Sequence, residues 1–265
     1  MRNVALVFRG ALCVVGLLCA SMATASDNET GGPNGLWQAF SDARHEVEDA
    51  SGGGALTAQN PANDLALRFE ADGLTIEPAL AGQDWRLTMS LAAWGQDGAM
   101  TRVNGVEPVA DGRRVELRRD GLTEWFVNRD RGLEHGFTVH RPAGYDPEAT
   151  LVLALELSGG LTARLDGDRQ GVSFAAPSGG YAFDYDELDV VDADGNELSG
   201  RLGLTVDGME IRVDVGHASW PVTIDPVISS ECTLAAFFDD AEAQDQFGRS
   251  VSVRSPATAP WTAVD

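Results

Sequence analysis

The sequence predicts an all-β fold, an antiparallel β-sandwich, on three observations. From Asp64 onward, short runs alternate apolar and polar residues with a period of two. Gly, Asp, Asn and Pro separate these runs at intervals typical of a sandwich or barrel. The helical patterns of roughly 10 to 15 residues that a parallel α/β fold places between strands are missing from the sequence. These patterns favour one antiparallel sandwich, or two small ones stacked, over a doubly wound sheet.

The start of the chain has the three-part layout of a secretory signal peptide. Basic residues flank its beginning, an apolar run covers residues 11–20, and Ala23 and Ala25 form an A-x-A cleavage site. The apolar run is too short for a membrane-spanning helix, which needs about 20 residues. We therefore expect residues 1–25 to be removed, and the mature protein to be secreted or held at the cell surface without a transmembrane segment.

Cysteine usage limits how the mature chain can be stabilised. Cys13 and Cys19 lie in the signal peptide, so only Cys232 remains and no internal disulfide can form. A lipoprotein signal at Cys19 is the alternative, but Leu18 stands where such signals need a small residue. The mature fold must therefore depend on buried apolar surface.

The chain is strongly acidic, with a formal net charge of -22, and all 19 of its basic residues are Arg. Such a charge repels nucleic acid and anionic membrane surfaces, and it favours solubility. We expect no nucleic-acid partner.

The segment 26–63 is predicted to be flexible, with one short regular element. Apolar residues spaced three and four apart over Leu36–Glu48 indicate an amphipathic helix, and a strand around residues 44–47 is the competing interpretation. Residues 51–54 are rich in glycine and indicate a link.

The segment 64–230 contains the β-sandwich-like domain. Its first hairpin places Leu65, Leu67 and Phe69 on one face and turns at Asp72-Gly73. A long strand from Trp85 to Trp94 follows. Further strands are predicted around the turn at residues 120–121 and in the stretches 151–168, 171–200 and 201–216. A division into two subdomains near residues 145–150 is an open alternative.

The sequence DQFGRSV, which contains Phe247, Gly248 and Ser250, resembles the start of an FG-GAP repeat, the blade unit of integrin-α-type β-propellers. Three earlier stretches resemble the leader region that precedes such repeats in exported bacterial proteins. They lie at residues 43–47 with 59–76, at 122–144, and at 220–228.

The resemblance implies a β leader followed by a propeller. A propeller needs at least about four blades of roughly 40 residues, and residues 231–265 amount to less than one. We therefore expect them to form an incomplete blade, with the chain breaking off where the propeller begins. Calcium loops of the family lie in repeats beyond this segment, so no cofactor is carried over. The implied role is adhesion or scaffolding without catalysis, with a cell-surface protein or a glycan as partner.

One stretch has the spacing of a calcium loop. Asp192, Asp194 and Asn196 place oxygen atoms at alternating positions, as a hard cation requires. However, Glu197 stands where the EF-hand pattern needs Gly, and Gly203 where it needs Glu. A hairpin turn is the competing and favoured interpretation, because Asp-Gly between strand-like runs is a strong turn signal.

Histidines do not form a convincing metal site in the sequence. The HEVED stretch at His45 resembles a zinc-protease helix, but Asp49 replaces its second His, so a solvated face is expected. His135 and His140 are five apart in a predicted strand and should point to opposite faces. His217 is expected in a turn.

A secreted hydrolase acting on polysaccharide, or a carbohydrate-binding module, is the alternative function. Glycosidases need two carboxylates across a sugar, and tryptophans can stack on sugar rings. The candidate carboxylates are Asp184, Asp186, Glu187 and Asp189, and the candidate tryptophans are Trp85, Trp94, Trp125 and Trp220. The bland interpretation of the tryptophans is burial in the core.

Overall fold

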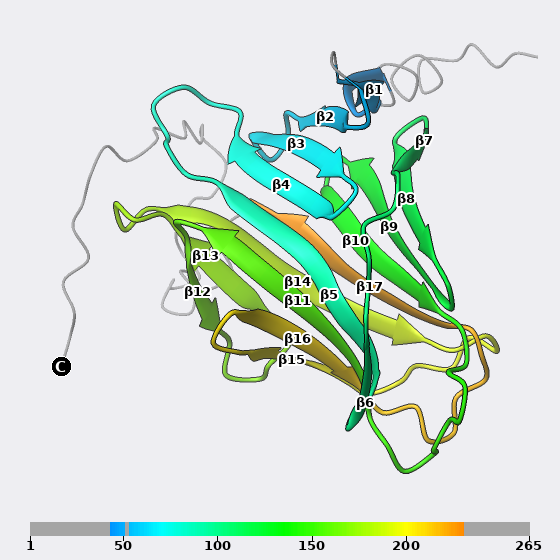
Figure 1. Ribbon diagram of the computed structural model, residues 1–265. Helices are drawn as coiled ribbons and strands as arrows, with labels where there is room; N and C mark the ends of the chain where they lie inside the picture. Colours follow the sequence, from blue (N-terminus) through cyan, green and yellow to red (C-terminus); the bar gives the residue numbers. More distant parts are fainter. Residues whose placement is uncertain (1–42, 51–52, 231–265) are drawn as a thin grey trace, which may run out of the picture.

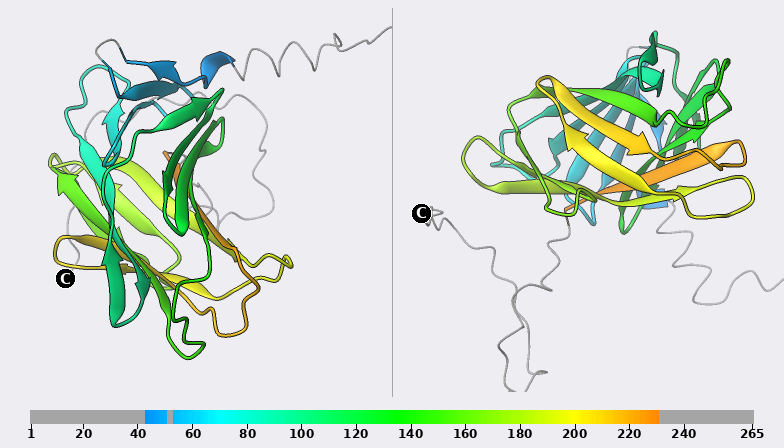
Figure 2. Two further views of the ribbon diagram at one scale, coloured as in Figure 1. Left: turned by 45° about the vertical axis from the view of Figure 1, so that its right-hand side comes forward. Right: turned by 90° about the horizontal axis from the view of Figure 1, so that it is seen from below.

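The computed structural model describes residues 43–50 and 53–230, which form two antiparallel sheets packed face to face (Figures 1 and 2). The predicted all-β fold is confirmed. The helix expected over residues 36–48 lies mainly outside the described residues, and the signal peptide and the FG-GAP-like segment lie wholly outside them.

The first sheet has nine strands in the order β1-β2-β3-β4-β5-β11-β16-β15, with β6 paired to β5. Its strands are β1 (Glu48–Asp49), β2 (Leu56–Asn60), β3 (Leu65–Glu70), β4 (Gly73–Pro78), β5 (Leu87–Gln96), β6 (Ala99–Arg102), β11 (Leu151–Gly159), β15 (Gly200–Leu204) and β16 (Gly208–Val213).

The second sheet has eight strands in the order β12-β13-β14-β17-β10-β9-β8-β7. Its strands are β7 (Val109–Asp111), β8 (Arg114–Arg119), β9 (Leu122–Arg129), β10 (Gly132–Val139), β12 (Thr162–Leu165), β13 (Val172–Ala175), β14 (Tyr181–Val191) and β17 (Val222–Ser229).

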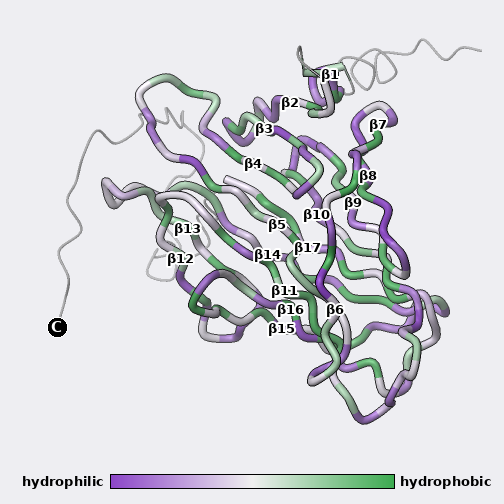
Figure 3. The backbone as a smooth tube through the Cα atoms, viewed as in Figure 1, coloured by the Kyte–Doolittle hydropathy of each residue, from purple (hydrophilic) through white to green (hydrophobic). Residues whose placement is uncertain are grey.

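Strands from before and after residues 145–150 share both sheets. β11 lies between β5 and β16, and β17 lies between β14 and β10. The alternating pattern directs one side chain in two toward the opposite sheet, so that apolar residues run along the central strands (Figure 3). Phe69 of the first sheet meets Phe126 of the second at a ring distance of 5.1 Å. Both sheets therefore enclose one hydrophobic core.

The edges of the two sheets are joined to each other by hydrogen bonds. At one edge, the Val47 amide donates to the Gly112 carbonyl at 3.0 Å. At the other edge, the Leu202 amide donates to the backbone carbonyl of Arg169 at 2.8 Å. The Gln170 side chain also donates to the Gly200 carbonyl. These bonds occupy backbone groups that would otherwise be exposed for pairing with another chain.

Three buried asparagines hold the beginning and the end of the described chain together. Asn60 donates to the Asn128 side chain at 2.8 Å, and Asn128 donates to the carbonyl of His45 at 3.2 Å. Asn63 accepts from the amide of Ser230 at 2.9 Å. We call Asn60, Asn63 and Asn128 the asparagine lock, and the end of the sandwich that contains them the lock end.

The opposite end of the sandwich carries long connections, and we call it the loop end. The segments after β10, β14 and β16 gather there, at the lower right of Figure 1. β9 runs from the loop end to the lock end over 8 residues, a length of roughly 25 Å. The chain thus enters and leaves the described body at one end and presents loops at the other.

Candidate functional site

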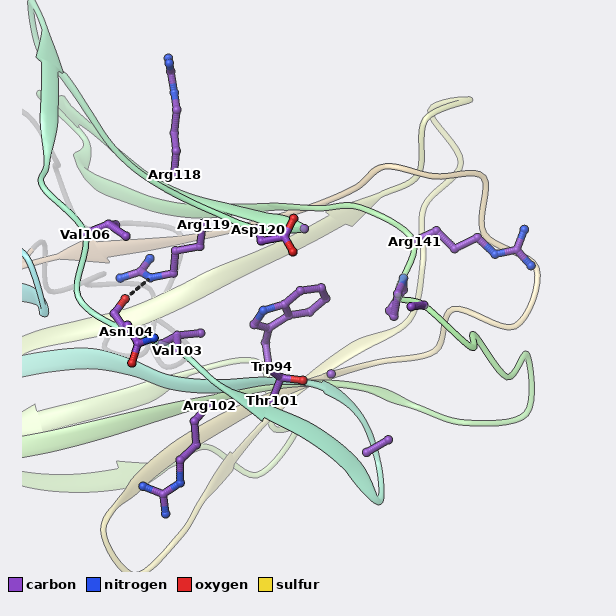
Figure 4. A pocket seen from close by; sticks show the side chains of 15 residues that line it. Trp94, Thr101, Arg102, Val103, Asn104, Val106, Arg118, Arg119, Asp120 and Arg141 are labelled. Atoms are coloured by element: carbon purple, nitrogen blue, oxygen red, sulfur yellow. Dashed lines mark hydrogen bonds between the residues drawn. The ribbon is translucent and has the colours of Figure 1, made fainter.

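A cavity of about 660 Å³ opens at the loop end, between the two sheets. Its walls come from the end of β5, from β6 and the segment that follows it, from the turn between β8 and β9, and from the residues after β10 (Figure 4). A neighbouring hollow of about 500 Å³ shares Arg102, Val103, Asn104 and Arg119 with it. Both sheets and a crossing segment therefore contribute to the site.

Trp94 projects into this cavity because of a β-bulge in β5. Leu91 faces the core, and regular alternation would make residue 93 the next inward-facing side chain. The pairing with β11 shifts between Ala154 and Leu155, so that Trp94 lies opposite Leu153, which is fully buried. Because a bulge reverses the alternation beyond it, the indole is directed inward at the open end of the sandwich.

Gly121 makes room for the indole on the opposite wall. It lies in the turn between β8 and β9 with φ of +74°, a conformation that favours glycine. A Cβ atom at this position would lie 2.9 Å from the Trp94 ring. The turn chemistry of Asp120-Gly121 and the packing of the tryptophan therefore both require glycine here.

Polar side chains line several walls of the cavity. Asp120, Asn104 and Thr101 are exposed and line the cavity, and Asp120 lies directly beside the indole in Figure 4. Arg119 also lines it and donates to the Asn104 carbonyl at 3.3 Å. The site therefore combines one aromatic surface with hydrogen-bond donors and acceptors.

The other cavity arginines have partners elsewhere or point away. Arg118 binds Glu116, and the Arg141 guanidinium lies 4.6 Å from the centre of the Tyr145 ring. Figure 4 shows Arg118, Arg141 and Arg102 directed away from Trp94. Of the charged side chains labelled in Figure 4, Asp120 is the one that lies beside the indole.

A buried row of polar side chains leads from the cavity wall into the core. Arg119 donates to Glu124 at 2.7 Å, and His135 Nε2 lies 3.0 Å from the other Glu124 oxygen. Tyr185 Oη lies 3.3 Å from His135 Nδ1. The side chain of Arg119 is only 5% exposed, so its guanidinium is held in place.

The electrostatics of this row favour a structural role. Burial, and then the charges of Glu124 and Asp225, raise the pKa of Tyr185 well above its usual value, so its hydroxyl stays protonated. His135 is 1% exposed and stacks on Phe126 at 4.6 Å. Both nitrogens of His135 already have polar neighbours, and the row fixes Arg119 in the cavity wall.

The predicted calcium loop forms a tight turn. Asp192 Oδ1 accepts hydrogen bonds from the amides of Asp194 and Asn196, each at 2.9 Å, and Oδ2 accepts from the Ser219 amide at 3.1 Å. These bonds, led by that from the Asn196 side chain, lower the pKa of Asp192 to about 2. Gly195 completes the turn with φ of +80°. The oxygens of Asp192 serve this turn and its attachment to Ser219.

The predicted carboxylate group lies on the outer face of the second sheet, away from the Trp94 cavity. Asp189 is paired with Asp225 across β14 and β17. Burial first, and then Asp184 and Glu187, raise the pKa of Asp186 to about 6. The pKa of Asp225 is also raised to about 6, by burial first and then by Glu134. Within the described residues, no group of three or more His, Cys, Asp or Glu could hold a metal ion.

The four candidate tryptophans do not share a face. Trp85 is buried against Phe183, and Trp220 packs edge-on against Tyr145. Trp125 lies on the outer face of the second sheet. Trp94 alone among these four lines the cavity.

The histidines also separate. His45, expected on a solvated face, is fully buried at the lock end, where the side-chain amide of Asn128 donates to the backbone carbonyl of His45. His135 is buried in the core, whereas His140 and His217 are exposed. The sequence motif residues Phe247, Gly248 and Ser250, and also Cys232, lie outside the described residues.

Sequence reasoning missed the asparagine lock, the Glu124–His135 pair and the inward direction of Trp94. Asn60 and Asn128 are far apart in the sequence, and a bulge leaves no signal in the alternation alone. One signal was available, since Glu124 and His135 both occupy positions that the strand pattern directs inward.

In the part of the chain that the structure describes, no helix is long and apolar enough to span a lipid bilayer. Comparison of the chain with protein-family models, with curated proteins and with solved structures finds no match.

Proposed function

We propose that this chain is an exported, non-enzymatic module of a cell-surface or extracellular protein, and that it works in adhesion or as a scaffold. The signal-like first 25 residues and the resemblance to FG-GAP leader regions support this role. Its partner is a cell-surface protein or a glycan.

One observation carries the proposal: the chain enters and leaves the sandwich at the lock end, and the loops and the cavity lie at the loop end. A module connected in this way directs its loops away from whatever follows it in the chain. The hydrogen-bonded edges between the two sheets suit a rigid spacer that does not pair with other strands.

Folding of the leader by itself is the first test. Residues 27–230 and residues 27–265 are produced separately and unfolded by heat while circular dichroism is followed. We expect both proteins to show a β-type spectrum and one cooperative transition at nearly the same midpoint. A disordered 27–230 protein would contradict the modular arrangement.

Orientation on a surface is the second test. Cys232 follows Ser230 closely in the sequence, so coupling beads through its thiol attaches the chain near the lock end. The comparison protein carries Cys232→Ser together with His217→Cys, an exposed position at the loop end. We expect beads coupled through Cys232 to adhere better to glycan-coated or protein-coated plates. Equal adhesion of the two bead types would count against display by the loop end.

The second candidate function is that of a carbohydrate-binding module or a polysaccharide hydrolase. Trp94 and Asp120 in one cavity favour binding. An assay of new reducing ends on the same glycans separates the two activities, because only a hydrolase releases them.

A further inference from the structure

We infer that the Trp94 cavity binds a neutral sugar ring, stacked on the indole and hydrogen-bonded by Asp120, Asn104, Thr101 and Arg119. The inference deepens the proposed function, on which it rests, by assigning the site and the class of partner. The residues that carry it come from both sheets and from the segment that crosses between them.

The indole supplies the apolar part of such a site. A sugar ring has a face of C–H groups and a rim of hydroxyls, and a tryptophan ring offers a flat surface of matching size. The bulge in β5 directs Trp94 into the cavity, and Gly121 leaves room for its ring because it has no Cβ. The volume of about 660 Å³ lies within the range of small-ligand sites and can accommodate one or two sugar rings.

The polar side chains supply the part that recognises hydroxyls. Asp120 can only accept hydrogen bonds while ionised, Arg119 can only donate them, and the side chains of Asn104 and Thr101 can do both. Neighbouring hydroxyls of a sugar need both kinds of partner at close spacing. Among the described residues, the Asp120 carboxylate has no hydrogen-bond or ion-pair partner, so its oxygens are available to a ligand.

The site is organised before a ligand arrives. Arg119 is held by Glu124 on one side and by the Asn104 carbonyl on the other. Because these contacts already fix the guanidinium, binding loses little side-chain freedom at this residue. The buried row through His135 and Tyr185 thus acts as the support of the binding wall.

Charge selects a neutral ligand over an acidic one. The chain has a formal net charge of -22, which disfavours the approach of polyanions. Within the cavity, Asp120 stands beside Trp94, and Glu124 neutralises Arg119. A uronic-acid or sulfated ring stacked on the indole would therefore lie beside the Asp120 carboxylate, while the guanidinium groups of Arg102, Arg118 and Arg141 point away from it (Figure 4).

The experiment titrates the mature chain, residues 26–265, with the β-linked and α-linked hexasaccharides of glucose and the β-linked hexasaccharides of mannose, galactose and xylose, together with hexagalacturonate. Tryptophan fluorescence and isothermal titration calorimetry report binding. We expect at least one neutral hexasaccharide to bind and hexagalacturonate to bind on the order of tenfold more weakly, which corresponds to about 1.4 kcal/mol.

The variants are Trp94→Leu, Asp120→Asn and Asp111→Asn. Trp94→Leu should weaken binding on the order of tenfold or more and remove the fluorescence change. Asp120→Asn preserves shape and should weaken binding several-fold even if Trp94→Leu fails to fold. Asp111→Asn makes the same charge change at an exposed position near the lock end and should leave affinity unchanged.

The inference is overturned if none of the neutral hexasaccharides binds, if hexagalacturonate binds best, or if the Trp94 and Asp120 variants bind as the unaltered chain does. Adhesion of Cys232-coupled beads to protein-coated plates in the absence of any sugar binding would leave the proposed function standing and refute the sugar site. A 27–230 protein that fails to fold would refute the module instead.

Discussion

Glu124 balances the charge of the buried row in the second sheet. Its side chain is 1% exposed and lies between the guanidinium of Arg119 and the imidazole of His135. Removing the carboxylate charge would leave the guanidinium buried without a counterion. Removing one partner of a buried ion pair destabilises a protein by far more than the intact pair stabilises it, because the remaining charge stays buried without a counterion.

Glu124→Gln is therefore expected to lower the free energy of unfolding by about 3 to 5 kcal/mol. The matched control is Glu116→Gln on the adjacent strand β8, where the carboxylate pairs with Arg114 and Arg118 nearer the surface; about 0 to 1 kcal/mol is expected there. Urea unfolding of the three proteins gives both values. An equal decrease in the free energy of unfolding in the two variants would show that the buried row stabilises the protein no more than the ion pairs of Glu116 do.

Asp186 and Asp225 make the free energy of unfolding depend on pH, and both favour the folded state at lower pH. The pKa of each is about 6 in the folded protein against an ordinary value of 3.8, so the folded state binds protons more readily than the unfolded state. The stabilisation that these two groups give the folded state is fully present below pH 3.8, the ordinary pKa, and is lost as pH rises through 6. Glu134 and Asp189 also raise the pKa of Asp225, and Arg131 and Arg129 oppose them.

We expect the midpoint of thermal unfolding to rise as pH is lowered from 7.5 to 5. Asp225→Asn should remove roughly half of that rise, because it removes one of two similar groups. Differential scanning calorimetry at four or five pH values measures the effect, and Asp111→Asn is the control at an exposed position. A midpoint that falls over this interval in the unaltered protein would contradict the assignment.

At the scale of the element, Trp125 shows why an outward-facing tryptophan is not necessarily a binding platform. One side of its indole lies across Gly136, where an added Cβ would come within 2.0 Å of the ring. The Arg114 guanidinium lies 4.6 Å from the ring centre, and the indole nitrogen donates to Thr138 at 3.2 Å. Trp125 is 7% exposed, and its indole covers the outer face of its own sheet.

Gly136→Ala is expected to destabilise the protein by about 1 to 3 kcal/mol, because the methyl group must displace the Trp125 ring. Gly167→Ala is the control, since a Cβ there would meet nothing within 4 Å; a change within about 0.5 kcal/mol is expected. Urea unfolding and the near-UV circular dichroism of tryptophan report the two effects. An unchanged near-UV signal in Gly136→Ala would show that the indole does not lie across Gly136.

The local hairpins could be predicted from the sequence, because both their turn residues and their alternation are local signals. The Asp120-Gly121 turn joins β8 to β9 as expected. β3 and β4 form the expected hairpin, but its two turn residues are Ala71 and Asp72, and Gly73 is the first residue of β4, paired with Glu70. The strand expected over residues 85–94 instead covers Leu87–Gln96 and contains the bulge. The direction of Trp94, and with it the cavity, depends on pairing with β11, which the sequence of β5 does not encode by itself.

At the scale of the whole molecule, the order of the strands and the asparagine lock were beyond sequence reasoning for a related reason. Both depend on contacts between segments far apart in the chain, such as Asn63 with Ser230 and Asn128 with His45. Asparagine beside proline or aspartate is also a common turn signal. Its burial in the lock depends on partners that only the folded chain brings near.

The lock leads to a prediction about how the two ends of the sandwich move. Asn63 accepts the amide hydrogen of Ser230 and its carbonyl accepts the Ser230 hydroxyl, so Asn63→Ala removes the side-chain anchor of the chain end. The variant should lose about 1 to 3 kcal/mol of unfolding free energy, because Asn60 also loses a buried partner.

Hydrogen exchange followed by mass spectrometry should show the amide of Ser230 exchanging on the order of tenfold faster or more. Peptides from residues 140–150 at the loop end should be little changed. Asn104→Ala, an exposed asparagine at the loop end, is the control and should leave Ser230 protected. Faster exchange throughout Asn63→Ala, at both ends alike, would mean that the asparagines stabilise the sandwich as a whole and do not specifically fix where the chain leaves it.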